Sequence, residues 1–245
     1  MTTATLLDEF HEALRPLRPR ALWAHGSLAG GDYQEGRSDL DLIAVLPAPL
    51  TLRTVRRLVM LHRGLRREPL AAKLHCSYLT PATLDDPDRS HFTWAHGHAM
   101  RRPVTPVTRR ELHDFGRVLD GEPPAGLLPP VPERQLNGFV VRDQRTFWRP
   151  AVDKARLWRQ DVWVDLGLLT FARATVTLRD GRLISKREAL DELPALGAPA
   201  EVVEDVARRR YDTPAPAPAD WPARRAGLTR AFLGPAIDAL VTTYE

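Results

Sequence analysis

The chain has little cysteine, little lysine and no long apolar run. Cys76 is the single cysteine among 245 residues, which excludes an internal disulfide and a cysteine-based zinc site and fits a reducing compartment. No apolar run approaches the roughly 18–20 residues that a membrane span needs, and residues 1–10 carry acids instead of the basic segment of a signal peptide. We therefore expect an untargeted cytoplasmic protein without a membrane partner.

The composition is otherwise that of a folded globular protein. Apolar residues make up 43% and charged residues 27% of the chain, which excludes collagen-like, coiled-coil and wholly disordered proteins. The length suits two domains of about 100–150 residues each.

Arginine dominates the basic residues. Only three of the 35 lysine and arginine residues are lysine, at positions 73, 154 and 186, and the net charge is +4. A coding preference for GC-rich codons is the simplest origin of this bias. The arginines are scattered in pairs along the sequence, without the clustering and interleaved aromatic residues typical of nucleic-acid-binding proteins. We therefore expect no nucleic-acid partner.

Residues 1–104 predict a small α/β domain with a mixed sheet. Apolar residues recur at helical spacing in two segments, and three short apolar runs bounded by glycine or polar residues are typical of strands. In chain order the pattern predicts a helix, two strands, a helix with a basic outer surface and a third strand, at Thr3–Leu17, Ala21–His25, Leu40–Leu46, Leu52–Arg67 and Lys73–Leu79. No G-x-G-x-x-G motif follows the first strand, which argues against a Rossmann unit.

Residues 105–245 predict an all-α domain, a helical bundle. Short proline-rich segments separate amphipathic stretches there, as breaks between helices do. The expected helices are Val107–Leu119, Pro132–Trp148, Val162–Leu178, Ser185–Leu193, Ala200–Arg210 and Pro222–Thr243.

The most informative motif joins a Gly-Ser pair to two aspartates. Gly26 and Ser27 follow the first predicted strand, and Asp39 and Asp41 open the second after a glycine-rich connection. Because side chains alternate along a strand, both carboxylates project from one face, and their hard oxygen atoms suit Mg²⁺ together with phosphate and water. A glycine turn lets the backbone approach a phosphate, to which a serine hydroxyl can donate. The alternatives are a solvated strand end and an ordinary turn.

This combination resembles the nucleotidyltransferase superfamily, the DNA polymerase beta-like proteins, whose pattern is Gly-Ser, a spacer and Asp-x-Asp. The resemblance implies that Asp39 and Asp41 are catalytic and bind the cofactor Mg²⁺. It also implies that Gly26, Ser27 and Ser38 contact the nucleotide, with ATP as the co-substrate.

The carboxy-terminal half narrows the resemblance. The segment LTFAR that ends at Arg173, followed by DGRLISK that ends at Lys186, is similar to the helical domain of streptomycin/spectinomycin adenylyltransferases. Ser185 and Glu188 also have the spacing of a capping box, which puts Lys186 in a first helical turn, where the helix dipole disfavours a cation. Such a lysine indicates an anionic partner such as a triphosphate; the alternative is a solvated surface lysine.

The same resemblance implies further binding residues. Arg173 and Lys186 would hold the triphosphate, and Tyr211 would lie near the nucleotide. For the acceptor, the nearest candidates are Trp94 and Asp165. Their alternatives are a packing tryptophan and an N-terminal helix charge.

One position departs from the family pattern. Members carry a third acid that activates the acceptor hydroxyl, in a context like Lys-Leu-Glu-x-Ser-Tyr, and this chain has Lys73-Leu-His-Cys-Ser-Tyr78. His75 stands in the place of the glutamate. A neutral imidazole can act as a general base near pH 7, so either histidine is the base or the third function has lapsed.

Two other interpretations of nearby residues are weaker. His91, His96 and His98 lie close in sequence but match no standard zinc-ligand spacing. Cys76 should face away from His75 on the same strand. We expect neither a zinc site nor a cysteine nucleophile.

We therefore expect a monomeric magnesium-dependent nucleotidyltransferase that moves AMP from ATP to a hydroxyl of a small molecule and releases pyrophosphate. The resemblance implies an aminoglycoside or aminocyclitol antibiotic as the acceptor, and hence antibiotic resistance, although such polycations favour an acidic cleft and this chain is basic. Two alternatives stay open: a catalytically weakened nucleotide-binding homologue, and an antitoxin-like nucleotidyltransferase acting on a protein or a tRNA end.

Overall fold

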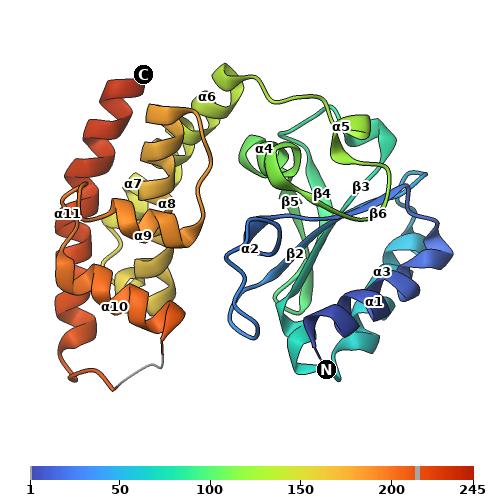
Figure 1. Ribbon diagram of the computed structural model, residues 1–245, viewed down its shortest axis with the longest axis horizontal. Helices are drawn as coiled ribbons and strands as arrows, with labels where there is room; N and C mark the ends of the chain where they lie inside the picture. The colour runs from blue at the N-terminus through green and yellow to red at the C-terminus, as the bar shows by residue number, and fades with distance from the viewer. Residues whose placement is uncertain (1, 213–215) are drawn as a thin grey trace. The chain divides into compact units, whose positions relative to one another are not determined.

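The computed structural model describes residues 2–212 and 216–245, and the chain divides into two units, Met1–Pro132 and Glu133–Glu245 (Figure 1). The division differs from the boundary after residue 104 that the sequence suggested. Residues 117–121 form a strand that pairs with β1, which joins this segment to the first unit.

A six-stranded mixed sheet forms the centre of the first unit. The strands lie in the order β5-β4-β3-β2-β1-β6, and only β2 and β3 are parallel neighbours. Their bounds are β1 Ala21–Ala24, β2 Leu40–Val45, β3 Leu74–Leu79, β4 Ser90–Ala95, β5 His98–Pro103 and β6 Arg117–Gly121. The parallel β2–β3 pair requires a crossover, which α3 supplies.

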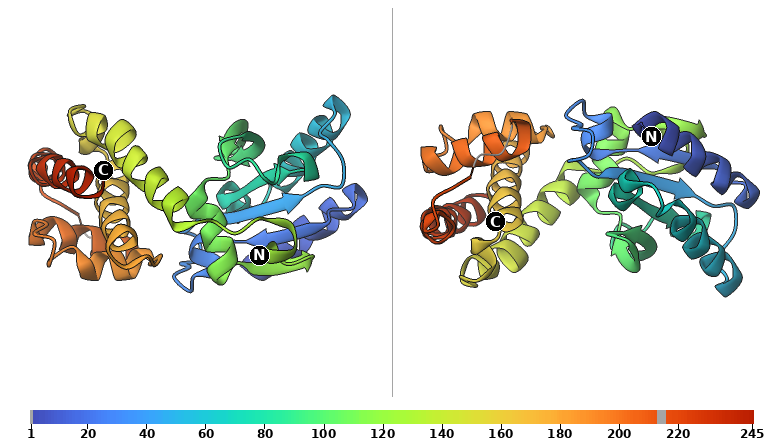
Figure 2. Two further views of the ribbon diagram at one scale, coloured as in Figure 1. Left: turned by 90° about the horizontal axis from the view of Figure 1, so that it is seen from above. Right: turned by 90° about the horizontal axis from the view of Figure 1, so that it is seen from below.

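Helices cover both faces of this sheet (Figure 2). On one face, α1 (Thr3–Leu14) and α3 (Leu52–Leu65) pack their apolar residues against a core that includes Leu42, Cys76 and Tyr78. On the other face, α4 (Pro106–Phe115) and α5 (Pro124–Leu127) cover a smaller core around Trp23 and Ile43. The alternation along β2 therefore places Leu42 in one core and Ile43 in the other.

Three strands and one helix end were not predicted. The expected helix Val107–Leu119 ends at Phe115, because Gly116 caps it through its N–H to the carbonyl of Leu112, and β6 begins directly after. Strand β5 is mostly exposed, and Ala99 and Met100 are adjacent instead of alternating with polar residues, so it lacks the pattern that marks a half-buried strand.

The second unit is helical, as expected. Its helices are α6 Glu133–Asp143, α7 Arg149–Val152, α8 Asp161–Asp180, α9 Lys186–Glu192, α10 Ala200–Tyr211 and α11 Trp221–Tyr244, and a π-helical turn, Gln144–Trp148, joins α6 to α7. Helix α8 is the most buried. A Cβ atom on Gly167 would lie 2.5 Å from the ring of Trp158, so this glycine lets the buried indole pack directly on the helix backbone.

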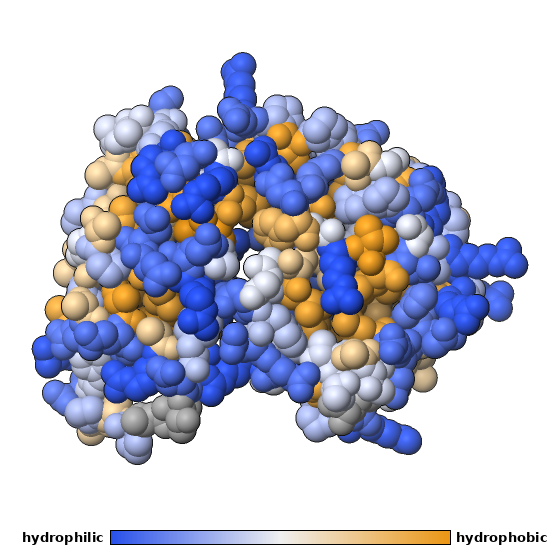
Figure 3. Space-filling model, viewed as in Figure 1, coloured by the Kyte–Doolittle hydropathy of each residue, from blue (hydrophilic) through white to orange (hydrophobic). Residues whose placement is uncertain are grey.

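The face of the molecule in Figure 3 is mostly hydrophilic, with separate apolar patches. None of the helices in the described residues combines the length and the apolar character that crossing a bilayer needs.

Candidate functional site

The paired aspartates lie at the start of β2, as the sequence predicted. Asp41 is the second residue of the strand and Asp39 directly precedes it, whereas Leu40 and Leu42 are buried on the opposite face. The carboxylates of Asp39 and Asp41 are 40% and 34% exposed, so both are open to a ligand.

His75 lies beside both aspartates. Strand β3 pairs with β2 in a register that places His75 next to Asp41. The ring atom Nδ1 of His75 is 3.4 Å from Oδ1 of Asp41, and Nε2 is 4.0 Å from Oδ1 of Asp39. His75 is buried, and among the described residues its Nε2 has no hydrogen-bond partner. The position where the resemblance implied a glutamate therefore places an imidazole nitrogen at the carboxylate pair.

A lysine that sequence reasoning did not assign also reaches this site. Nζ of Lys73 lies 3.6 Å from Oδ1 of Asp39 and donates a hydrogen bond to the carbonyl of Arg37 at 3.1 Å. Its positive charge offsets part of the repulsion between two neighbouring carboxylates.

The Gly-Ser motif packs directly against Asp41. The expected tight turn is the single helical turn α2, Gly26–Ala29, and Gly26 has a φ of +61°. A Cβ atom on Gly26 would lie 2.9 Å from Oδ2 of Asp41. Ser27 follows in the same turn. Ser38, the other predicted nucleotide contact, is buried beside Asp39, and its hydroxyl accepts a hydrogen bond from the N–H of Gln34.

A partly buried histidine–glutamate pair borders the same site and was not predicted from the sequence. Nδ1 of His25 lies 3.2 Å from Oε2 of Glu111 on α4, and the His25 N–H donates to the carbonyl of Asp41. Burial alone would lower the pKa of His25, but the Glu111 hydrogen bond and the charges of Asp41 and Glu111 raise it above its ordinary value. Residues 25 and 111 are far apart in sequence, so no local spacing indicates this pair.

The two histidines and Asp41 line a small cavity of about 120 Å³ on the same face of the sheet. Its other polar lining residues include Ser77, Thr93 and Arg102. The cavity is therefore polar on several sides and lies within the first unit.

In the second unit, the predicted phosphate-binding residues surround the loop between α8 and α9. Nε of Arg173 donates to the carbonyl of Ile184 at 2.8 Å. The predicted capping box is confirmed: Ser185 and Glu188 exchange side-chain and backbone hydrogen bonds, and Lys186 is the first residue of α9.

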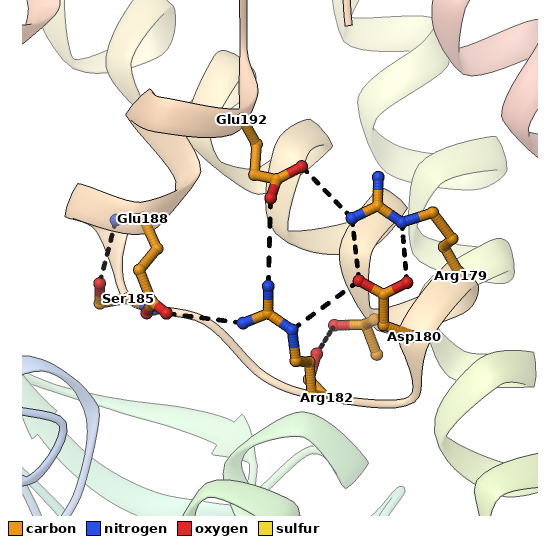
Figure 4. A network of polar contacts seen from close by, with 7 residues as sticks. Arg179, Asp180, Arg182, Ser185, Glu188 and Glu192 are labelled. Carbon is orange, nitrogen blue, oxygen red and sulfur yellow. Dashed lines mark hydrogen bonds and ion pairs between the residues drawn. The ribbon is translucent and has the colours of Figure 1, made fainter. Parts of the chain in front are cut away.

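A network of ion pairs holds this loop in place (Figure 4). Arg179 pairs with Asp180 at 2.8 Å and with Glu192 at 3.3 Å, and Arg182 pairs with Glu188 at 3.5 Å. Single exposed pairs stabilise a protein by at most about 1 kcal/mol, but here the same side chains form several pairs that tie α8 to α9. The network therefore fixes the segment from which Lys186 projects.

Tyr211 lies against the same helix. The guanidinium carbon of Arg187 is 3.9 Å from the centre of the Tyr211 ring, a cation–π contact between α9 and the end of α10. The structure therefore brings Tyr211 to the residue that follows Lys186.

The two acceptor candidates are both engaged in contacts within their own units. Trp94 on β4 is buried and stacks on the ring of His62 with centroids 4.9 Å apart, which is the packing role named as its alternative. Asp165 lies 2.7 Å from Nη2 of Arg209 and is 15% exposed. Burial raises the pKa of Asp165 against the opposing effect of Arg209.

The two weaker interpretations find no support. Among the described residues no three His, Cys, Asp or Glu side chains could hold a metal ion together; His91 is buried in β4, and His96 packs against His75 with ring centroids 4.5 Å apart. Cys76 is fully buried on the other face of β3, and burial raises the pKa of its thiol to about 12. An unreactive thiol follows.

Comparison with known proteins identifies the fold. A solved structure of the spectinomycin adenyltransferase AAD(9) from Enterococcus faecialis, with ATP and spectinomycin, superposes with a TM-score of 0.74 over 96% of this chain and 99% of that one, at 18% sequence identity. No protein-family model and no curated protein matches the sequence. The predicted fold, a small mixed-sheet domain followed by a helical domain, is thereby confirmed.

Proposed function

We propose that the protein is a nucleotidyltransferase that moves AMP from ATP to a hydroxyl of a small molecule and releases pyrophosphate. The observation that carries this proposal is the pair Asp39 and Asp41: both carboxylates are partly exposed at the start of β2, and Asp41 packs against the Gly26 turn. The fold shared with an adenyltransferase supports it.

Asp39 and Asp41 fit a magnesium site in which the substrate supplies part of the coordination. Two carboxylates are too few for an all-protein cage, but Mg²⁺ is commonly held by one or two carboxylates together with phosphate oxygens and water. The ion, when bound, supplies charge neutralisation on the triphosphate. Gly26 gives Asp41 the space it occupies, since any side chain there would meet its carboxylate.

Arg173, Lys186 and Tyr211 are proposed to bind the nucleotide. Lys186 stands at the first residue of α9, where the positive end of the helix dipole disfavours a cation unless an anion neutralises it. A triphosphate is such an anion. Arg173 lies on α8 and donates a hydrogen bond to the carbonyl of Ile184, in the loop that leads to Lys186.

His75 is proposed to act as the general base. In the reaction, the acceptor oxygen forms a bond to the α-phosphorus, the bond from that phosphorus to the bridging oxygen breaks, and pyrophosphate leaves. The acceptor proton passes to Nε2 of His75, the nitrogen without a hydrogen-bond partner among the described residues. General-base catalysis of this kind contributes about 10²–10⁴-fold in rate.

The acceptor is proposed to be a hydroxyl-bearing antibiotic. The fold neighbour was solved with spectinomycin, and we propose an aminocyclitol or aminoglycoside as the first compounds to test. His75 in place of a carboxylate favours the second candidate, a nucleotide-binding homologue with weakened catalysis, because an imidazole attracts a cationic acceptor less than a carboxylate does.

The test is incubation with ATP, Mg²⁺ and hydroxyl-bearing antibiotics, followed by mass spectrometry of the products. We expect an adduct heavier than the acceptor by one AMP unit, and no adduct with the double variant Asp39→Asn/Asp41→Asn. Asp8→Asn/Asp114→Asn is the matched control, because it removes two exposed carboxylates elsewhere in the first unit. Full activity of the Asp39/Asp41 variant contradicts the mechanism, and ATP binding by calorimetry without any transfer favours the second candidate.

A further inference from the structure

The outer surface of α3 carries a row of exposed arginines and no acid. Arg53, Arg56, Arg57 and Arg63 are all exposed on this helix, whose 14 residues include neither aspartate nor glutamate. The chain as a whole has 31 acidic residues. A codon bias toward arginine explains many arginines, but it does not explain the absence of acids from one exposed helix surface.

These four arginines have no partners in the part of the chain that the structure describes, neither an ion pair nor a hydrogen bond from the side chain. Arginines elsewhere are commonly paired: Arg149 with Asp238 at 2.8 Å and Arg225 with Asp205 at 2.9 Å are examples. The charge on α3 is therefore not neutralised within the chain.

Three of these four charges do not stabilise the helix, whereas Arg63 lies in the last turn, where the dipole favours a cation. Arg53 is the second residue of α3, close to the helix N-terminus, where the dipole disfavours cations, and the first turn contains no acid. Arg53 also stands three and four residues before Arg56 and Arg57, a spacing at which like charges repel on a helix. The like charges of Arg53, Arg56 and Arg57 therefore oppose helix formation, and binding of an anionic partner would account for them.

We infer that the outer surface of α3 binds the phosphodiester backbone of a nucleic acid. From Arg53 to Arg63 the helix rises about 15 Å, so the four guanidinium groups form a line of one sign that suits a chain of regularly repeated phosphates. Arginine is also the side chain that binds phosphate in a bidentate manner. The sequence had suggested no nucleic-acid partner because the arginines are scattered along the chain; helical geometry gathers these four.

Other anionic partners fit this surface less well. A helix that lies on a membrane inserts a continuous apolar face. Leu52 and Met60 are exposed on α3, but Met60 stands between Arg57 and Arg63, and the apolar side of the helix around Leu58 is buried in the core of the first unit. Folded protein surfaces commonly intersperse charges of both signs, whereas a nucleic-acid backbone carries negative charge alone. The surface is independent of the proposed nucleotide site, because α3 covers the face of the sheet opposite to Asp41 and His75.

The test is fluorescence anisotropy with a labelled RNA duplex and a labelled DNA duplex across a range of salt concentrations. Four phosphate contacts predict a slope of about −3 to −4 in log affinity against log salt, which is about a 100-fold loss between about 50 and 200 mM. The variant Arg53→Gln/Arg56→Gln/Arg57→Gln/Arg63→Gln should lose most of this slope, while its melting temperature stays equal or rises because like charges are removed. The RNA and DNA arms show which duplex is preferred, and either one supports the inference.

A control variant separates local binding from net charge. Arg15→Gln/Arg134→Gln/Arg145→Gln/Arg224→Gln removes the same four charges from exposed positions outside α3, and we expect it to keep the salt slope. Equal losses in the two variants, or no duplex binding by the unchanged protein, overturn the inference. Phosphatidylserine vesicles and polyglutamate are tested in the same way, as probes for a membrane and for an acidic protein. Binding to either of these without binding to a duplex overturns the inference as well.

Discussion

Gly26 leaves space for the carboxylate of Asp41 to lie against the backbone: a Cβ atom on residue 26 would be 2.9 Å from Oδ2 of Asp41. Real Cβ atoms do not come this close to an oxygen atom that is not bonded to them. Gly26 also has a φ of +61°, a conformation that glycine adopts without steric cost. Residue 26 must therefore be glycine for two separate reasons: its backbone has a positive φ, and a side chain would occupy the space of the Asp41 carboxylate.

The variant Gly26→Ala is expected to lose transfer activity by a large factor and to lose about 1–2 kcal/mol of stability. The stability loss comes from the positive φ, and the activity loss comes from displacement of Asp41. Activity is measured by AMP transfer, and stability by urea denaturation.

Gly31→Ala is the control, because Gly31 has a φ of +76° but open space around its Cβ position. We expect Gly31→Ala to lose stability to a similar extent and to keep its activity; equal activity losses would mean that backbone strain alone explains both variants.

Variants of His75 test whether an imidazole can serve as the general base where the resemblance implied a carboxylate. His75→Ala should reduce the rate of transfer by about 10²–10⁴-fold if Nε2 accepts the acceptor proton, with little change in ATP affinity. His75→Glu should retain or raise activity, because a carboxylate at this position can take the same proton. Initial rates and calorimetry separate the two effects. A rate for His75→Ala equal to that of the unchanged protein would rule out the base, and activity found only in His75→Glu would mean that the natural chain is not a working transferase.

The parts of the site that follow from local geometry could be predicted from the sequence. Alternation along β2 places Asp39 and Asp41 on one face, and the spacing of Ser185 and Glu188 is enough to place Lys186 at the start of α9. The position of His75 next to them could be expected only from the retained sequence around it, because the β2–β3 register is a tertiary property.

The missed features depend on contacts that are distant in sequence. The pair His25 and Glu111 joins two elements of the first unit, and neither residue stands in a recognisable motif. Val118 and Leu119 in β6 continue the helical spacing of apolar residues in α4. The sequence pattern therefore predicts this segment as the end of the helix. The glycine at position 116 is the local signal that could have ended the helix correctly.

Arg109 fixes the loop before β4 and should be a strong determinant of stability. It is 2% exposed and donates from Nε to the carbonyl of Val104 and from its two other nitrogens to the carbonyls of Leu84 and Asp86. Arg109→Met leaves buried carbonyl groups unpaired, which should cost about 3 kcal/mol or more in the free energy of unfolding. Arg110→Met, which breaks an i,i+4 pair with Asp114, should cost about 0.5 kcal/mol. Urea denaturation of the two variants tests the difference, and similar losses would contradict the role of Arg109.

Stability should fall on acidification because His62 is buried in its neutral form. His62 is 3% exposed, its Nε2 lies 2.7 Å from the Tyr78 hydroxyl, and burial lowers its pKa to about 3. Between about pH 6.5 and that value the unfolded chain binds a proton at this residue that the folded chain does not. The free energy of unfolding should therefore be independent of this group above about pH 6.5 and decrease by about 1.4 kcal/mol per pH unit below it. The variant His62→Gln retains a polar group for Tyr78 but does not titrate. Its free energy of unfolding should therefore change less steeply with pH between about pH 6 and 4, by about 1.4 kcal/mol per pH unit, which corresponds to one proton. Denaturation curves at several pH values measure both slopes, and identical slopes would show that His62 is protonated in the folded protein.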